Sequence, residues 1–284
     1  MERKEAFQTF LITTFIRISG YSTIFFVGMI LVFILGQGLP ALKEVELSSL
    51  FSTRWYPIEG FFGILPLIGG SIVVTIGATL IAVPFGIGTA IYISEIAPRW
   101  ARELLKPLVE VLAGLPSVVL GFIGIVSLSP FIREFFNLPT GLSALTGSLL
   151  LGAIAIPTIV SVAEDALDSV PKEYRDGAFA LGATKWQTIW TVTLPAAKSG
   201  VLTAIMLGIA RSIGETMTVM MVTGNAPVLP TGLEAIVSPI RTMTATIAAE
   251  MGEVANGGSH YAVLFFIAIV LFLISLVINI AASA

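Results

Sequence analysis

Six apolar runs alternate with polar segments along the chain. They cover residues 18–36, 66–94, 108–131, 142–163, 199–223 and 261–283. Most approach or exceed the roughly 20 apolar residues that an α-helix needs to cross about 30 Å of hydrocarbon. One globular core could not bury so many apolar residues, so the pattern predicts an all-α integral membrane protein with six transmembrane helices.

Proline interrupts two of these runs. The third contains Gly114-Leu115-Pro116-Ser117 and the fourth Ile156-Pro157. Proline inside a span leaves a backbone carbonyl without its partner, which is tolerated only where protein or a wet cavity satisfies it. Each break is either a packing kink or a sign that the helix lines a translocation path. In the long segment 224–260, residues 243–253 are expected to form a further helix.

Composition agrees with a membrane protein, since 56% of the residues are hydrophobic and 12% are charged. No basic cluster with interleaved aromatics is present, so a nucleic-acid partner is not expected. The chain has no cysteine, which excludes disulfides, thiol catalysis and thiolate metal sites, and no metal or cofactor is expected. The first run lacks a convincing cleavage site at Gln37-Gly38-Leu39-Pro40, which favours a retained helix over a signal peptide.

The basic residues are distributed unequally between the two sides of the predicted spans. With the N-terminus inside, the cytoplasmic segments hold Arg3, Lys4, Arg17, Arg99, Arg102, Lys106, Lys172, Arg175, Lys185 and Lys198. The outer segments hold only Lys43, Arg54, Arg133 and Arg241. Because positive residues concentrate on the cytoplasmic side, both termini are predicted to be cytoplasmic.

A polar loop, 168–196, joins the fourth and fifth runs. Its apolar residues recur at three- and four-residue spacing, namely Phe179, Ala183, Trp186 and Trp190. This spacing predicts one apolar helical face, which favours a partner protein, although such a loop could also lie on its own membrane surface. Gly182 is expected at a sharp turn between two short helices. Leu194-Pro195 is expected to open the next helix, because proline suits a first turn.

The fifth run contains Arg211 and Glu215, with Ser212 between them. Four-residue spacing places the two charges on one face of a continuous helix. A charge at mid-membrane costs about 2.5 to 3.5 kcal/mol on insertion scales, so such residues usually face protein or water. The hypothesis is that Arg211 lies on an anion path with Ser212 and Glu215, because its planar fork suits tetrahedral oxyanions. Glu215 would pair with Arg211 when no anion is present. The alternative is that the pair only ties this helix to a neighbouring subunit.

Four other carboxylates and the histidine are weaker candidates for functional residues. Glu95 and Glu110 flank the loop before the third run, and Glu164 and Asp165 begin the next inner loop. Glu95 and Glu110 are expected to be solvated or to snorkel to the inner surface, and Glu164 and Asp165 are expected to be solvated. His260, the only histidine, is expected at the outer interface rather than as a ligand.

The loop sequence also resembles a known motif. Asp176-Gly177-Ala178, Gly182 and Val192-x-Leu194-Pro195 match the spacing of the EAA loop of ABC importer permeases, with Asp for Glu, Gly for the first Ala and Val for Ile. The resemblance implies the type I importer permease fold, as one domain over 1–284 with a core at 66–283. It also implies that an ATPase docks on residues 176–190, including Trp186.

Further strings resemble the phosphate-specific subgroup of these permeases. They are Phe62 to Leu67, Leu105 to Ser117, Tyr174 to Lys185, Arg211-x-Ile213-Gly214-Glu215-Thr216-Met217 and Thr244 to Ala248. The homologous A-type subunit shares the loop and a similar arginine string. Gly224-Asn225, the segment 241–253 and Gly258-x-His260-Tyr261 favour the C-type (PstC-type) subunit.

This resemblance implies an importer of inorganic phosphate in a prokaryotic cell membrane. Its partners would be a second, A-type permease, a cytoplasmic ATPase dimer and an external phosphate-binding protein, within membrane lipid. The chain lacks a Walker A string, so it is not expected to be the enzyme that hydrolyses ATP. ATPase closure would drive alternating access of the permease halves. A permease for another oxyanion, an ATP-independent secondary transporter and an intramembrane hydrolase are the alternatives, the last requiring a nucleophile and base that are not evident.

Overall fold

Long helices formed by the apolar runs make up most of the molecule. A computed structural model describes residues 2–283. Its long helices are α1 (Glu2–Gly38), α4 (Leu65–Ile91), α5 (Arg99–Ala113), α8 (Ala144–Asp168), α12 (Lys198–Gly214) and α15 (Ser259–Ser283). Short helices are α2 (Ala41–Glu44), α3 (Leu47–Leu50), α6 (Ser117–Ile123), α7 (Ser129–Phe135), α9 (Lys172–Ala180), α10 (Lys185–Thr188), α11 (Leu194–Ala196), α13 (Met217–Val222) and α14 (Met243–Glu250).

Wider helical turns and a small hairpin complete the chain. Three π-helical segments cover Tyr92–Ile96, Gly124–Leu128 and Ile189–Thr193, and 3-10 turns cover Pro57–Glu59 and Leu233–Ile236. The two strands, β1 (Trp55–Tyr56) and β2 (Phe61–Phe62), pair antiparallel with Trp55 opposite Phe62.

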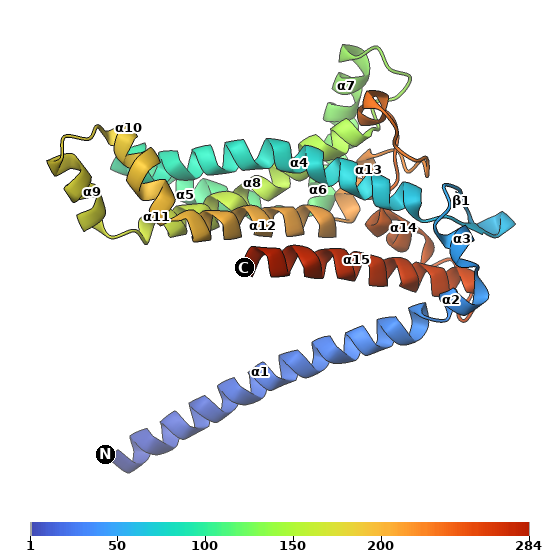
Figure 1. The fold of residues 1–284 in the computed structure, drawn as a ribbon, viewed down its shortest axis with the longest axis horizontal. Coiled ribbons are helices and arrows are strands. Elements are labelled where there is room, and N and C mark those ends of the chain that lie inside the picture. Colours follow the sequence, from blue (N-terminus) through green and yellow to red (C-terminus); the bar gives the residue numbers. More distant parts are fainter. Residues whose placement is uncertain (1, 284) are drawn as a thin grey trace.

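The central helices α4, α8 and α12 run side by side, with α15 along α12 (Figure 1). Helix α1 diverges from this bundle and meets α15 near α2 (Figure 1). Helices α9, α10 and α11 lie together at one end, which we call the α9 end, while the hairpin, α3 and α14 lie at the opposite end (Figure 1). Helix α15 returns from the opposite end toward the α9 end, as α4 and α8 do.

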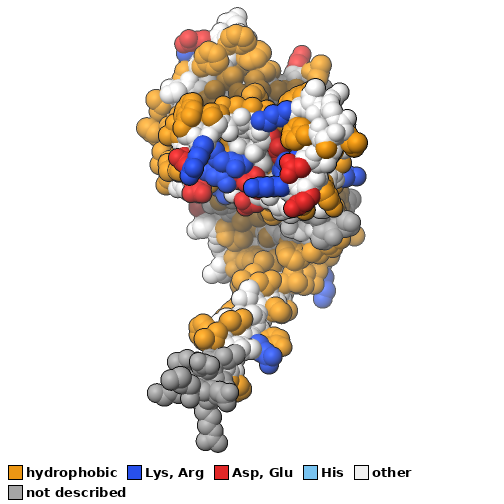
Figure 2. Space-filling model, turned by 90° about the vertical axis from the view of Figure 1, so that its left-hand side faces the viewer, with side chains coloured by type: hydrophobic (Ala, Val, Ile, Leu, Met, Phe, Trp, Pro, Cys, Tyr) orange, Lys and Arg blue, Asp and Glu red, His pale blue; other side chains and the backbone are white. Residues whose placement is uncertain are grey.

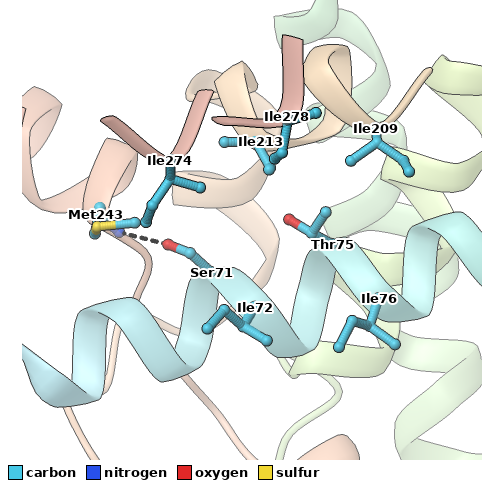
Figure 3. A pocket seen from close by; sticks show the side chains of 9 residues that line it. All are labelled: Ser71, Ile72, Thr75, Ile76, Ile209, Ile213, Met243, Ile274 and Ile278. Atoms are coloured by element: carbon cyan, nitrogen blue, oxygen red, sulfur yellow. Dashed lines mark hydrogen bonds between the residues drawn. The ribbon is translucent and has the colours of Figure 1, made fainter. Parts of the chain in front are cut away.

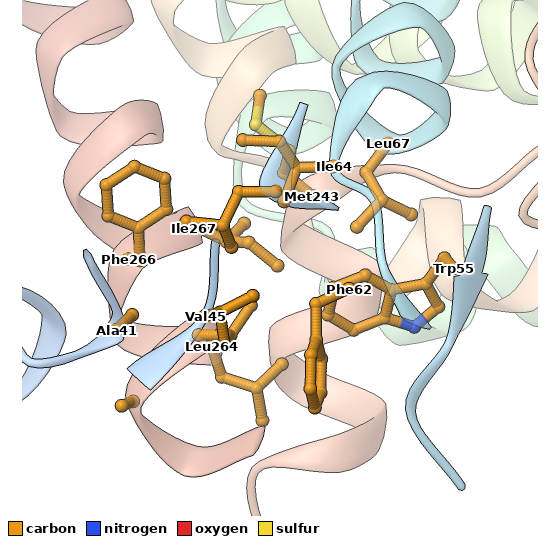
Figure 4. Close-up of a cluster of buried hydrophobic side chains, with 13 residues drawn as sticks. Ala41, Val45, Trp55, Phe62, Ile64, Leu67, Met243, Leu264, Phe266 and Ile267 are labelled. Carbon is orange, nitrogen blue, oxygen red and sulfur yellow. The ribbon is translucent and has the colours of Figure 1, made fainter. Parts of the chain in front are cut away.

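Two apolar cores hold the ends of the bundle. At the α9 end, small and aliphatic residues of α4, α8 and α12 pack together: Ala82, Ala90, Ile91, Ala155, Ile159, Ala163, Leu167, Val201 and Ala204. At the opposite end, the hairpin and α2 pack on α15 through Val45, Trp55, Phe62, Leu264 and Ile267 (Figure 4). Glycine permits the close approach of the central helices, because a Cβ at Gly208 would lie 2.5 Å from Ile159 Cγ1.

The prediction of several membrane-spanning helices is confirmed, but two of the six predicted spans are broken in the structure. Among residues 2–283, five helices are long and apolar enough to cross a membrane, and a bent pair supplies a sixth. That pair, Lys185–Ala196 and Lys198–Gly214, bends by 75°. The third span was expected at 108–131, but the helix breaks at Gly114 to Pro116 and the candidate span is Ser117–Phe135. Helix α5 ends at Ala113, and Pro116, whose backbone is extended, is the N-cap residue of α6.

The fifth predicted span is also broken. Helix α12 ends at Gly214, Glu215 is extended with φ −69° and ψ 130°, and α13 begins at Met217. A single helix over 199–223 is therefore wrong. The helix expected at 243–253 is present as α14, which ends at Glu250.

Candidate coupling and transport sites

The loop between α8 and α12 folds into two short helices at the α9 end. Helix α9 ends at Ala180, and Gly182 then takes a left-handed conformation with φ +85°. Thr184 caps α10, because its hydroxyl accepts from the Gln187 amide while the Gln187 side chain accepts from the Thr184 amide. The prediction that Gly182 separates two short helices is confirmed.

Large apolar side chains of this loop are exposed. They are Tyr174, Phe179, Leu181, Trp186 and Trp190, with exposed fractions between 46% and 90%. The rings of Trp186 and Trp190 meet edge to face, 5.8 Å apart. We call these five residues the apolar docking surface. A soluble chain seldom leaves such a patch uncovered, so the surface indicates a partner or lipid.

The other residues of the motif surround this surface. Asp176 and Gly177 are exposed and Ala178 is half-buried on α9. Leu194 and Pro195 begin α11 as expected, but α11 ends at Ala196 and the transmembrane helix α12 starts separately at Lys198. Leu194 and Pro195 therefore lie just before the 75° bend that precedes the span, rather than in the first turn of the span itself.

The residues assigned to the anion path do not form the expected pair. Because α12 ends at Gly214, Arg211 and Glu215 do not share a helical face, and no ion pair joins them in the described chain. The Glu215 carboxylate instead accepts from the Thr218 amide at 3.4 Å, at the start of α13. Their predicted pairing is wrong, because an extended residue interrupts the helical spacing.

Arg211 and Ser212 point into different surroundings. Ser212 is buried and donates its hydroxyl to the Gly208 carbonyl at 3.1 Å. It lines, with Glu215 and Thr244, a cavity of only about 10 Å³. Arg211 is exposed, and no hydrogen bond or ion pair engages its guanidinium within residues 2–283. The structure thus brings Ser212 and Glu215 together and leaves Arg211 on the surface of the bundle.

Charged side chains of both signs gather at the α9 end (Figure 2). Arg175 donates to Glu95 at 2.6 Å, and the Glu95 side chain is only 9% exposed. Lys106 Nζ lies 2.6 Å from Glu164 Oε1, whose side chain is 6% exposed. The expectation that Glu95 and Glu164 are solvated is therefore wrong.

A second charged cluster lies at the opposite end. Glu250, the last residue of α14, accepts from Arg241 and His260, each at 2.8 Å, and from the Trp55 indole at 3.1 Å. His260 lies at the first turn of α15, half-buried, so it is part of an internal network rather than a simple interfacial residue. Sequence reasoning missed this cluster because Trp55 and Glu250, which bond to each other, lie 195 positions apart.

Helices α4, α12 and α15 line an apolar groove of about 180 Å³ (Figure 3). Isoleucines line it from three helices: Ile72 and Ile76 of α4, Ile209 and Ile213 of α12, and Ile274 and Ile278 of α15. Its Ser71 hydroxyl accepts from the Met243 amide at 3.0 Å. No charged group lines the groove, so it is not an anion site.

The bundle has the fold of ABC importer permeases. It resembles a chain of a bacterial alginate ABC transporter with a TM-score of 0.60 and 14% identity, over 92% of this chain and 91% of the other. It also resembles a chain of the MetNI methionine ABC transporter with a TM-score of 0.57 and 20% identity, over 78% and 91%. The chain belongs to the family described as "Binding-protein-dependent transport system inner membrane component", which matches residues 82–284.

Curated relatives are closer in sequence. The chain is 44% identical over 231 residues to the "Probable ABC transporter permease protein YqgH" of Bacillus subtilis, covering 81% of this chain and 74% of that protein. It is 34% identical over 264 residues to the "Phosphate transport system permease protein PstC" of Xylella fastidiosa, covering 86% and 80%. The protein is thus the multi-pass, non-catalytic permease subunit of an ABC importer, which works with an ATPase and a periplasmic binding protein.

Proposed function

We propose that this chain is the C-type permease subunit of an ATP-driven importer of inorganic phosphate. It works beside an A-type permease, above a cytoplasmic ATPase dimer, and receives phosphate from an extracytoplasmic phosphate-binding protein. Similarity to a relative named as a phosphate permease supports this substrate. The relative of 44% identity carries no substrate in its name, so the argument for phosphate also has to stand on the chemistry of this chain.

The exposed guanidinium of Arg211 is the observation that carries the substrate proposal. Arg211 lies thirteen residues beyond Lys198 on α12, which is about 20 Å along the helix at 1.5 Å per residue. That depth is well inside a hydrocarbon layer about 30 Å thick. A charge there must face water or another protein rather than lipid. An arginine fork at such a place suits a tetrahedral oxyanion that passes between two permease subunits.

The apolar docking surface and the residues Asp176, Gly177, Ala178, Gly182, Leu194 and Pro195 form the proposed ATPase contact. Edge-to-face tryptophans with large exposed area are typical anchors of a protein interface. Exposed Gly177 and Gly182 add no side chain of their own, so a partner can approach their backbone closely. This arrangement favours a protein partner over a loop that only rests on lipid.

The orientation follows from the same arrangement. The α9 end carries Arg102, Lys106, Lys172 and Arg175, as expected for a cytoplasmic face. Both termini are proposed to be cytoplasmic, since α1 starts toward that end and α15 returns toward it (Figure 1). The hairpin end then faces outward, where the binding protein delivers phosphate.

Docking is tested by purifying the membrane complex in mild detergent and identifying its partners by mass spectrometry. The parent chain should bring an ATPase and a second permease, whereas Gly182→Trp should lose the ATPase. Gly60→Trp is the matched control, because Gly60 shares the left-handed conformation and open surroundings but lies at the hairpin end. Equal ATPase recovery with both variants contradicts the docking assignment.

The anion path is tested by phosphate uptake with Arg211→Gln. The variant should assemble normally and lose uptake, while Arg133→Gln, an exposed arginine near the hairpin end, should retain it. Loss of assembly with Arg211→Gln would instead assign Arg211 to a tie between subunits. Uptake inhibited by molybdate or sulfate rather than by phosphate would assign another oxyanion, and uptake without an ATPase would assign a secondary transporter.

A further inference from the structure

Arg175 connects helix α9 to two other helix ends. Its Nε and Nη2 atoms donate to Glu95 Oε1 at 3.0 and 2.6 Å. Its Nη1 atom donates to the Val170 carbonyl at 2.7 Å, and Nη2 also donates to the Leu167 carbonyl at 2.8 Å. One side chain of α9 is therefore bonded both to the segment that ends α4 and to the last turn of α8.

This connection is largely shielded from water. The Arg175 and Glu95 side chains are 17% and 9% exposed, so their ion pair is less screened than a surface pair. Within residues 2–283, no other side chain of α9 makes a hydrogen bond to the bundle. The peptide chain already joins α9 to α8, and α9 also packs on Ile189–Thr193. Arg175 adds the link to α4, which lies about 80 positions away in sequence.

A second arginine fastens the same two ends to each other. Arg102 of α5 donates to the Ile93 carbonyl at 2.9 Å and the Ser94 carbonyl at 2.8 Å, both beyond α4. It also lies 3.0 Å from Asp168 at the end of α8. A cavity of about 390 Å³ lies between the two arginines. Arg102 therefore holds the segment after α4 against the end of α8, beside the contacts of Arg175.

We infer that Arg175 is the positioning residue through which movement of α9 reaches α4 and the transmembrane bundle. The inference rests on the proposed docking of an ATPase on α9. A partner that displaces α9 acts on α8 through the chain, and the Arg175–Glu95 pair gives α9 a second, direct attachment to the segment after α4. The apolar core of α4, α8 and α12 begins directly beyond these ends, and close-packed helices move as a unit rather than deform.

The inference is tested in the reconstituted complex with Arg175→Gln, by measuring ATPase recovery, ATP hydrolysis and uptake on the same preparation. The ATPase should stay bound and hydrolyse ATP, while uptake per ATP falls by about 5- to 150-fold, the range of common coupling free energies. Glu95→Gln should give the same direction with a smaller fall, because glutamine loses the charge but keeps an oxygen that can accept from Arg175. Arg175→Lys should keep part of the uptake per ATP that Arg175→Gln loses, since lysine can pair with Glu95 but lacks the planar guanidinium of arginine.

The matched control is Arg99→Gln, which removes an ion pair to Glu103 whose side chains are 93% and 66% exposed, on the same end of the bundle. It should leave uptake per ATP unchanged. An unchanged ratio in both Arg175→Gln and Glu95→Gln would overturn the inference. Loss of the bound ATPase in those variants would also overturn it, because Arg175 would then serve docking rather than transmission.

A readout without substrate separates this inference from the phosphate proposal. The chain has no cysteine, and a Cβ at Gly214 would meet nothing within 4 Å, so Gly214→Cys provides a single thiol near the end of α12. ATP should change the rate at which a water-soluble reagent labels this thiol in the parent complex, but not in the complex that also carries Arg175→Gln. An ATP effect of equal size in the parent and in the Arg175→Gln complex would refute the inference that Arg175 transmits movement of α9. A parent complex that shows this ATP effect, lost with Arg175→Gln, but takes up no phosphate would refute only the substrate proposal.

Discussion

Removing the carboxylate of Glu250 should destabilise the hairpin end of the protein. This group joins three separate elements, because it accepts from Trp55 of β1, from Arg241 before α14 and from His260 of α15. The Glu250 and Arg241 side chains are only 17% and 15% exposed. In Glu250→Ala, Arg241 would keep its charge in a largely desolvated place without its partner.

The cost follows from this geometry. Breaking a buried ion pair by removing one partner costs about 3 to 5 kcal/mol, and the residual exposure favours the lower value. Glu250→Gln keeps an acceptor oxygen and loses the charge, so about 1 to 2 kcal/mol is expected. Glu59→Ala is the control, because its pair with Arg54 has side chains 54% and 61% exposed and should contribute at most about 1 kcal/mol.

The assay is unfolding of the detergent-solubilised protein, followed by Trp fluorescence and by circular dichroism. Glu250→Ala should show the largest loss of unfolding free energy of the three variants, with Glu250→Gln between it and Glu59→Ala. The reasoning is refuted if Glu250→Ala costs no more than Glu59→Ala. That result would mean that water already solvates Arg241, and that the contacts of Glu250 do not stabilise the packing of the hairpin.

Further predictions concern packing, charge and docking. Gly208→Val should cost about 1 to 3 kcal/mol through overpacking, measured by thermal unfolding, whereas Gly214→Ala, where a Cβ meets nothing within 4 Å, should cost much less. Lys106→Ala should cost about 1 to 3 kcal/mol because it removes the 2.6 Å ion pair of buried Glu164; unchanged stability would contradict that pairing. Trp186→Ala should weaken ATPase recovery by at least about tenfold if it is an interface anchor, without lowering thermal stability.

Hydrophobic patterning predicts the long helices well because each span must bury its own backbone bonds in lipid. Helices α4, α8 and α15 begin within two residues of the predicted spans. The third span failed because apolar residues on one face of amphipathic α5, such as Leu108 and Leu112, continue the apolar run into α6. Only the backbone at Gly114 to Pro116 separates them, and a count of apolar residues does not register such a break.

The candidate site was predictable where a local sequence determines it. The turn at Gly182 follows from the missing side chain of glycine and from the capping residues around it. Burial of Glu95 and Glu164 was not predictable, because their partners Arg175 and Lys106 come from other helices and meet them only in the folded bundle. The conformation of Glu215 was not predictable either, because its extended backbone depends on α12 ending at Gly214.

The most direct test of the central claim is phosphate uptake into proteoliposomes that contain the permease pair and the ATPase, with binding protein and phosphate on the hairpin side. Uptake should require ATP on the α9 side, should stop with a nonhydrolysable analogue, and should disappear with Gly182→Trp. Phosphate uptake at the same rate without ATP, or by this chain alone, would contradict an ATP-driven importer in which α9 and α10 receive the ATPase.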